Sequence, residues 1–152
     1  MNVHTWPALA AVLGVAAMSG GMATAEQRPE AVQVPLAATP QNAGKIAVAT
    51  LIPTGSATTQ IMLLVSGLPS ETARPATMYS YIYPGTCSNL GPKPAFDLNQ
   101  HVLLDETLPM KIWKSVPAAM SELRSGNYAI VLRASPADGF SNLFCGNLGQ
   151  SA

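Results

Sequence analysis

Apolar residues along the chain occur in short runs separated by turn-forming residues, a pattern typical of β-strands. The runs Lys45–Ile52 and Gln60–Val65 are separated by Pro53-Thr54-Gly55-Ser56, which predicts a hairpin. The same criteria predict further strands over Ala76–Tyr83, closed by Pro84-Gly85, and over Phe96–Leu104, Met110–Lys114, Tyr128–Arg133 and Leu143–Leu148. Loops are predicted between them, over Cys87–Pro94 and Ser135–Gly139.

The segment Met110–Lys114 alternates between apolar and basic residues, which indicates a strand with one solvent-exposed face. Lys111 and Lys114 flank Trp113, and we expect both lysines on the exposed face.

One helix is predicted, over Val116–Arg124. Ser115 is a suitable N-cap, Pro117 suits the first turn and Gly126 suits the end. About seven short strands spaced about ten residues apart, with a single short helix, favour an all-β fold. We expect an antiparallel β-sandwich or flattened barrel.

The N-terminus has the pattern of a secretory signal peptide. Ala8–Met18 is an apolar run, Ser19-Gly20-Gly21 interrupts it, and Ala23-Thr24-Ala25 has the small residues that a signal peptidase recognises. The alternative is an uncleaved N-terminal anchor, but the apolar run is short for a hydrocarbon layer about 30 Å thick. We therefore expect a periplasmic or secreted protein without a membrane span after cleavage.

These patterns divide the chain into three parts. Residues 1–25 are the predicted signal peptide. Residues 26–43 are rich in Ala, Pro and Gln, and prolines within them prevent a long helix, so a flexible or edge segment is expected. Residues 44–152 form the predicted β-sandwich domain.

The two cysteines, Cys87 and Cys145, predict one disulfide bond in an exported chain. The alternative is a thiolate pair that binds copper or zinc. The spacing does not favour it, because neither cysteine belongs to a Cys-x-x-Cys motif.

Charge excludes one class of partner. The chain has eight basic and eight acidic residues and a formal net charge of zero, and its charges are scattered singly. Nucleic acid is not an expected partner, because a protein that neutralises phosphates needs a basic patch or stripe.

Catalytic motifs are not found in the sequence. There is no Gly-x-Ser-x-Gly, no Ser-x-x-Lys and no glycine-rich phosphate loop. Beyond the predicted signal peptide the single histidine is His101, near Asp105 and Glu106, so a site built on two or more imidazoles is excluded there. We expect no catalytic, cofactor-binding or metal-binding residues, although an unrecognised enzyme stays an alternative.

Several fragments resemble the copper/zinc superoxide dismutases and similar smaller secreted proteins. Tyr81-Ile82-Tyr83 lies where that family has His-x-His, and Cys87 to Lys93 has the spacing of its Cys to Gly-Pro-His segment. Tyr128–Arg133 is similar to the late strand that ends in His, and Cys145-Gly146-Asn147-Leu148 is similar to the closing Cys-Gly-x-Ile motif. The resemblance covers about half of the chain beyond the signal peptide and implies a Greek-key, superoxide dismutase-like fold.

The same resemblance implies that the metal chemistry is lost. The copper-ligand positions are Tyr81, Tyr83, Lys93 and Arg133, none of which is an imidazole, and the family's active-site arginine aligns with Asn142. Lysine and arginine are protonated near neutral pH and repel a metal cation. Dismutation is therefore not expected.

Tyr79, Tyr81 and Tyr83 alternate along one predicted strand, so their side chains share a face. They either fill the space that ligands and metal leave, or form an aromatic platform that binds a partner. With Arg133 and Lys93 nearby, such a platform suits an anion or a carboxylate.

Methionine offers a second possible chemistry, because thioethers bind Cu(I). Met62, Met78, Met110 and Met120 are spread singly along the chain, which favours core packing. Our expectation is thus an exported, non-catalytic protein that binds an unidentified protein or small ligand. The alternative is a periplasmic copper-handling protein using methionine or His101.

Overall fold

The computed structural model describes residues 30–99 and 108–149. In this part of the chain, nine strands form one curled antiparallel sheet, accompanied by one α-helix and two short 3-10 helices. The strands are β1 (Val32–Ala38), β2 (Ala47–Pro53), β3 (Thr59–Val65), β4 (Met78–Thr86), β5 (Asn89–Leu90), β6 (Phe96–Asp97), β7 (Met110–Val116), β8 (Tyr128–Ala134) and β9 (Asn142–Asn147). The helices are α1 (Met120–Ser125), η1 (Pro40–Asn42) and η2 (Pro136–Asp138).

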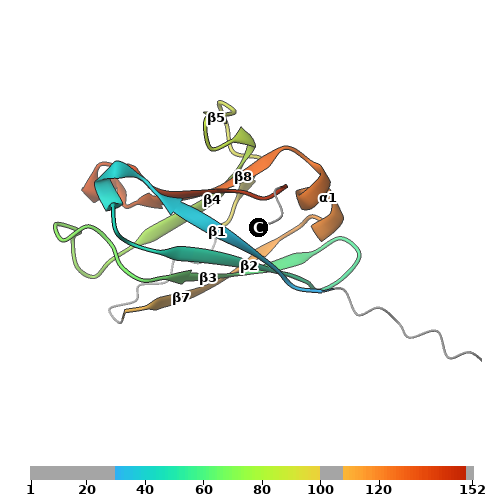
Figure 1. Ribbon diagram of the computed structural model, residues 1–152, viewed down its shortest axis with the longest axis horizontal. Coiled ribbons are helices and arrows are strands. Elements are labelled where there is room, and N and C mark those ends of the chain that lie inside the picture. Colours follow the sequence, from blue (N-terminus) through green and yellow to red (C-terminus); the bar gives the residue numbers. More distant parts are fainter. Residues whose placement is uncertain (1–29, 100–107, 150–152) are drawn as a thin grey trace, which may run out of the picture.

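The sheet curls into two layers. Its strand order is β5-β4-β8-β9-β1-β2-β3-β7, and β6 also pairs with β4. Figure 1 shows β4 and β8 in the upper layer, β2, β3 and β7 in the lower layer, and β1 crossing between them. The ends of the curled sheet are β7 and the short strands on β4, and residues of β6 and β7 border one cavity. The predicted antiparallel all-β class with one short helix is confirmed.

The core lies between the two layers. Inward positions alternate with outward ones, most regularly in β3 and β7. Burying one large apolar side chain stabilises the fold by about 1.5–3 kcal/mol. The largest fully buried side chains include Leu51, Ile61, Leu63, Ile82, Leu123, Ile130, Leu132 and Phe144.

The prediction that residues 26–43 form a flexible or edge segment is wrong for the described part. Val32–Leu36 pair with β2, and Ala37 and Ala38 pair with β9, so β1 joins the two layers. Pro35 is tolerated because the β9 pairing begins only at Ala37, which leaves β1 with one paired neighbour beside the proline. The folded domain thus begins before residue 44. The predicted signal peptide, residues 1–25, lies outside the described residues.

The predicted helix over Val116–Arg124 begins too early. Val116 is the last residue of β7 and pairs with Thr59, so the ladder with β3 continues through the proposed cap, Ser115. The helix α1 starts after Ala119 and ends at Ser125, and Gly126 is its C-cap, as predicted for the end of the helix.

The end of β4 also differs from the prediction. β4 continues through Pro84 and Gly85 to Thr86, because Pro84 still pairs with Tyr128 of β8. Gly85 has φ +100°, and a Cβ there would clash with the carbonyl oxygen of Asn89. Only glycine therefore fits this turn. The short strand β5 that follows lies within Cys87–Pro94, the segment predicted as a loop.

The predicted strand over Phe96–Leu104 is only partly described. In its described part only Phe96 and Asp97 form a strand, β6, whereas Leu98 and Asn99 do not, and residues 100–107 lie outside the described ranges. The hairpin of β2 and β3 and the strands β8 and β9 are confirmed.

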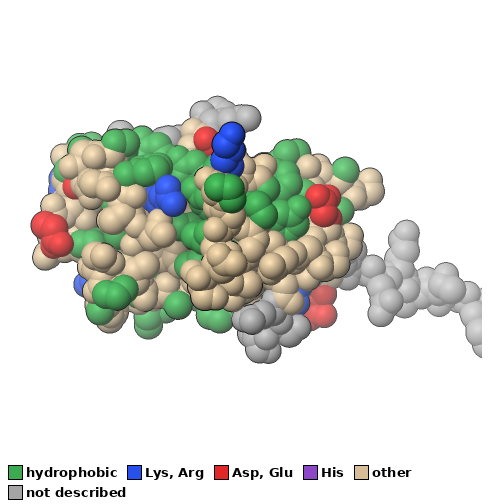
Figure 2. Space-filling view, turned by 90° about the horizontal axis from the view of Figure 1, so that it is seen from above, with side chains coloured by type: hydrophobic (Ala, Val, Ile, Leu, Met, Phe, Trp, Pro, Cys, Tyr) green, Lys and Arg blue, Asp and Glu red, His purple; other side chains and the backbone are tan. Residues whose placement is uncertain are grey.

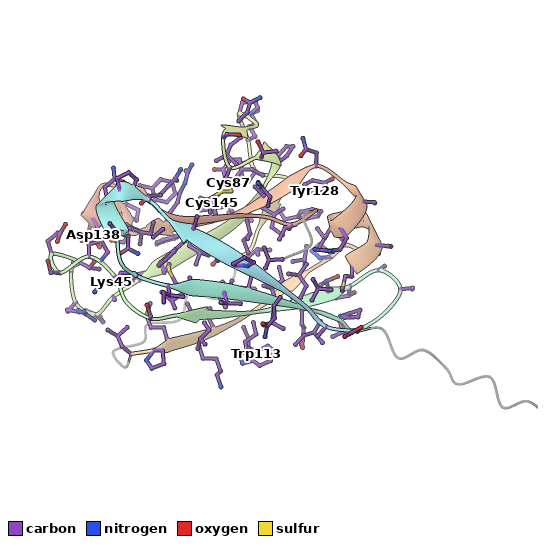
Figure 3. The ribbon with its side chains drawn as sticks, in the orientation of Figure 1. Lys45, Cys87, Trp113, Tyr128, Asp138 and Cys145 are labelled. Carbon is purple, nitrogen blue, oxygen red and sulfur yellow. A yellow bond between two sulfur atoms is a disulfide. The ribbon has the colours of Figure 1, made fainter. Side chains whose placement is uncertain are left out.

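The predicted disulfide between Cys87 and Cys145 is confirmed. It joins the end of β4 to β9 across the upper layer, with a Cα–Cα distance of 5.8 Å (Figure 3). The side-chain oxygen of Asn147 accepts a 2.8 Å hydrogen bond from the backbone N–H of Cys87. This hydrogen bond and the disulfide together hold the loop that follows β4 against β9.

Candidate functional site

The candidate site is the outer face of β4 and β8, centred on Arg133. The guanidinium carbon of Arg133 lies 5.8 Å from the ring centroid of Tyr81, 5.3 Å from that of Tyr83 and 5.0 Å from that of Phe140. These distances are typical of cation–π contacts. We call Tyr79, Tyr81, Tyr83, Arg133 and Phe140 the aromatic face.

The rings of the aromatic face also contact one another. Phe140 packs edge-on against Tyr79 at 5.9 Å and against Tyr81 at 6.0 Å, and Tyr81 lies 6.2 Å from Tyr83. The predicted alternation of the three tyrosines on one face is consistent with the register, in which Met78, Ser80 and Ile82 point to the core.

Arg133 is oriented by Asn142 of β9. Its Nε donates a 2.7 Å hydrogen bond to Oδ1 of Asn142. The two residues lie opposite each other because the register shifts by one residue after the pair of Leu132 and Phe144, which leaves Leu143 as an extra residue on β9. Such a bulge re-aims side chains. Here it brings Asn142 to the face on which Arg133 lies.

Phe140 reaches the aromatic face through an unusual backbone conformation. Its φ is +52°, in the left-handed region that aromatic residues seldom adopt. The turn is held by Ser135, whose carbonyl oxygen accepts hydrogen bonds from the N–H groups of Asp138 and Phe140. Asp138 in turn accepts a 2.9 Å hydrogen bond from the N–H of Ala73, which ties the loop before β4 to this turn.

The hydroxyl of Tyr81 stays protonated at neutral pH. Burial raises the pKa of Tyr81 above its ordinary value of 10.0, and the charge of Asp97 and the neighbouring Tyr83 raise it further. Arg133 acts in the opposite direction but does not reverse the shift. Tyr81 therefore adds a neutral hydroxyl donor beside a permanent cation.

Not all sequence-predicted residues meet at this face. Lys93 is exposed in the loop between β5 and β6, and in the described part of the chain it makes no hydrogen bond or ring contact. Met78 is buried in the core, on the opposite side of β4 from the tyrosines. Figure 2 looks onto the upper layer, which contains β4 and β8, and shows hydrophobic side chains gathered on it among scattered charged ones.

The prediction that Lys114 lies on the exposed face of β7 is wrong. Lys114 points inward and is 6% exposed, whereas Trp113 is 49% exposed. The pairing of Ile61 with Lys114 explains this, since Ile61 faces the core and directly paired residues share a face. Figure 3 shows Trp113 projecting from the lower layer. The apolar and basic residues of β7 thus do not separate by face.

The inward position of Lys114 coincides with a cavity of about 470 Å³ between β6 and β7, which we call the seam pocket. Burial lowers the pKa of Lys114, while the nearby carboxylate of Asp97 acts in the opposite direction. The pocket is lined by Thr58, Ala95, Phe96, Asp97, Leu98, Trp113, Lys114, Ser115 and Pro117.

Among residues 30–99 and 108–149, no three His, Cys, Asp or Glu side chains are grouped so that they could hold a metal ion. His101, Asp105 and Glu106 lie outside the described residues. No helix in the described ranges has the length and apolarity needed to span a membrane.

Comparison with known proteins identifies no relative. No protein-family model matches the chain, and neither a curated protein nor a solved structure is similar to it at a significant level.

Proposed function

We propose that this protein is an exported, non-catalytic binding protein with a superoxide dismutase-like Greek-key fold, and that its aromatic face binds a carboxylate-bearing partner. The single observation that carries the binding proposal is the position of the Arg133 guanidinium over the rings of Tyr81, Tyr83 and Phe140.

The strand order supports the Greek-key part of the proposal. β3 is followed in the sheet by β7 and not by β4, and β4 pairs with β8, so the connections from β3 to β4, from β6 to β7 and from β7 to β8 cross between the layers. The disulfide supports export, because such bonds persist in oxidising compartments.

The proposed loss of metal chemistry follows from the residues at the family's ligand positions. Arg133 is a permanent cation, and its guanidinium lies over the rings of Tyr81 and Tyr83. Its positive charge repels a metal cation from the same space. Tyr81 and Tyr83 fill that space with aromatic surface instead of imidazole nitrogen.

A carboxylate is the partner group that suits this face best. Asn142 occupies Nε of Arg133, and in the described part of the chain the terminal amino groups of the guanidinium make no other hydrogen bond. A guanidinium held in one orientation binds a carboxylate through two parallel N–H bonds. The protonated hydroxyl of Tyr81 can donate a third.

The test is a titration of the purified protein with a hexaglutamate peptide, followed by backbone amide NMR signals. We expect saturable shifts on β4, β8 and β9, and at least about tenfold weaker binding by Arg133→Gln. Arg74→Gln is the matched control, because it removes the same charge from an exposed loop. Absence of saturable shifts, or equal losses in both variants, would refute the proposal.

A titration with Cu(I), Cu(II) and Zn(II) tests the non-metal part separately. We expect no stoichiometric binding. Tight stoichiometric copper binding would replace our proposal by metal handling through methionine or His101.

A further inference from the structure

A charged side chain occupies a core-facing position at the edge of the sheet. Met110, Ile112 and Val116 are the other inward residues of β7, and each is buried. Lys114 lies among them with only 6% of its surface exposed. Withdrawing an ammonium group from water is costly unless an anion or polar group compensates. Lys114 has an interaction within the chain, and its position keeps a cation beside the apolar core.

The cavity beside Lys114 is large enough for a small molecule. Its volume of about 470 Å³ lies in the range of ligand-binding pockets. Phe96 and Leu98 contribute apolar surface from one side of the seam, and Trp113 and Pro117 contribute it from the other. The lining thus combines apolar walls with the buried Lys114 and with the polar residues Thr58, Asp97 and Ser115.

We propose that the seam pocket binds a small carboxylate with an apolar, preferably aromatic, body. The carboxylate contacts the ammonium group of Lys114, and the apolar body lies between Phe96 and Trp113. This site is separate from the aromatic face and does not depend on the function proposed for it.

An anion is favoured over a cation although the pocket also contains Asp97. Asp97 is exposed to water, and its Oδ1 accepts hydrogen bonds from the backbone N–H and the Nδ2 of Asn99, at 2.9 and 2.7 Å. Water screens an exposed charge far more than a buried one. A ligand charge therefore gains more from Lys114 than from Asp97.

Lys114 can accept a ligand in addition to its contacts within the protein. It already takes part in an interaction with the rest of the chain. An ammonium group has three N–H donors, so a ligand carboxylate can be added to an existing partner.

The experiment uses 3-phenylpropanoate as the probe and the indole N–H NMR signal of Trp113 as the reporter. The chain has two tryptophans, and Trp113→Phe identifies the reporter signal. We expect a saturable shift of this signal. The uncharged 3-phenylpropanamide should bind at least about tenfold more weakly, because it lacks the charge that Lys114 contacts.

Two variants locate the binding. Lys114→Met should weaken binding of 3-phenylpropanoate at least about tenfold, whereas Lys111→Met removes an exposed charge from the same strand and should leave it unchanged. If Lys114→Met does not fold, the comparison of carboxylate and amide on the unaltered protein decides the matter. Equal binding of the two probes, equal effects of the two variants or no saturable shift would overturn the proposal.

The outcome is independent of the aromatic face. Arg133→Gln should not change the response of the Trp113 indole signal to 3-phenylpropanoate, and Lys114→Met should not change the shifts that hexaglutamate causes on β4, β8 and β9. The two proposals can therefore fail separately.

Discussion

Arg133 and Asn142 are joined by a 2.7 Å hydrogen bond from Nε to Oδ1, across a register shift between β8 and β9. The shift places the amide beside the guanidinium, and the guanidinium beside three aromatic rings. A flexible arginine is thereby restricted to one orientation, which reduces the entropy lost when it binds a partner.

Removal of this hydrogen bond should destabilise the protein. We expect Asn142→Ala to lower the free energy of unfolding by about 1.5 kcal/mol, because Arg133 loses the acceptor of a charge-assisted bond at a half-exposed position. Asn89→Ala, at an exposed position on β5, is the control and should have little effect. Urea unfolding measures both. Equal stabilities of the two variants would contradict the role given to Asn142.

The conformation of Phe140 allows strain and ring contacts to be separated. Phe140→Ala and Phe140→Gly both remove the ring that contacts Arg133, but only glycine adopts a φ of +52° without steric cost. We expect the glycine variant to be more stable than the alanine variant by about 1 kcal/mol. Thermal unfolding of the pair measures this difference. An alanine variant as stable as the glycine variant would show that the turn relaxes.

The titration of Tyr81 should make stability fall at high pH. The folded protein keeps the phenol proton at pH values where the unfolded chain, with a pKa near 10.0, has lost it. This contribution to stability is complete below pH 10 and is lost as the pH rises through the raised pKa of the folded state. Tyr81→Phe should reduce this decline, measured by urea unfolding between about pH 9 and 12.

The same titration can be followed directly by the ultraviolet absorbance of tyrosinate. Asp97→Asn removes a negative charge opposite Tyr81 and should lower the pKa of Tyr81. A titration curve that Asp97→Asn leaves unchanged would contradict this assignment.

The disulfide should contribute strongly to stability. Cys87 and Cys145 are 58 residues apart in the sequence, and closing a loop of this length in the unfolded chain stabilises the folded state by about 4 kcal/mol. We expect a double Cys→Ser variant to unfold at a clearly lower temperature. Reductant should destabilise the unaltered protein in the same way and leave the variant unchanged, and an unchanged melting midpoint in the variant would refute the prediction.

Local patterns predicted several elements well. The hairpin of β2 and β3 follows from two apolar runs around a Pro-Thr-Gly-Ser turn, and β8 follows from a run of β-branched and aliphatic residues. The helix was placed too early, because Ser115 and Pro117 resemble a cap and a first turn, whereas pairing with β3 extends β7 to Val116. A long-range ladder there outweighed a local capping preference.

The sequence by itself determined the all-β class, the pairing of its two cysteines and the common face of Tyr79, Tyr81 and Tyr83. Each depends on residue type or on the two-residue period of a strand, which are local properties. Only the tertiary structure decided that β1 joins the two layers, that Lys114 points inward and that Asn142 orients Arg133. The reason is that the face a residue occupies, and the neighbour it meets, depend on strand pairing and register, which join segments far apart in the chain.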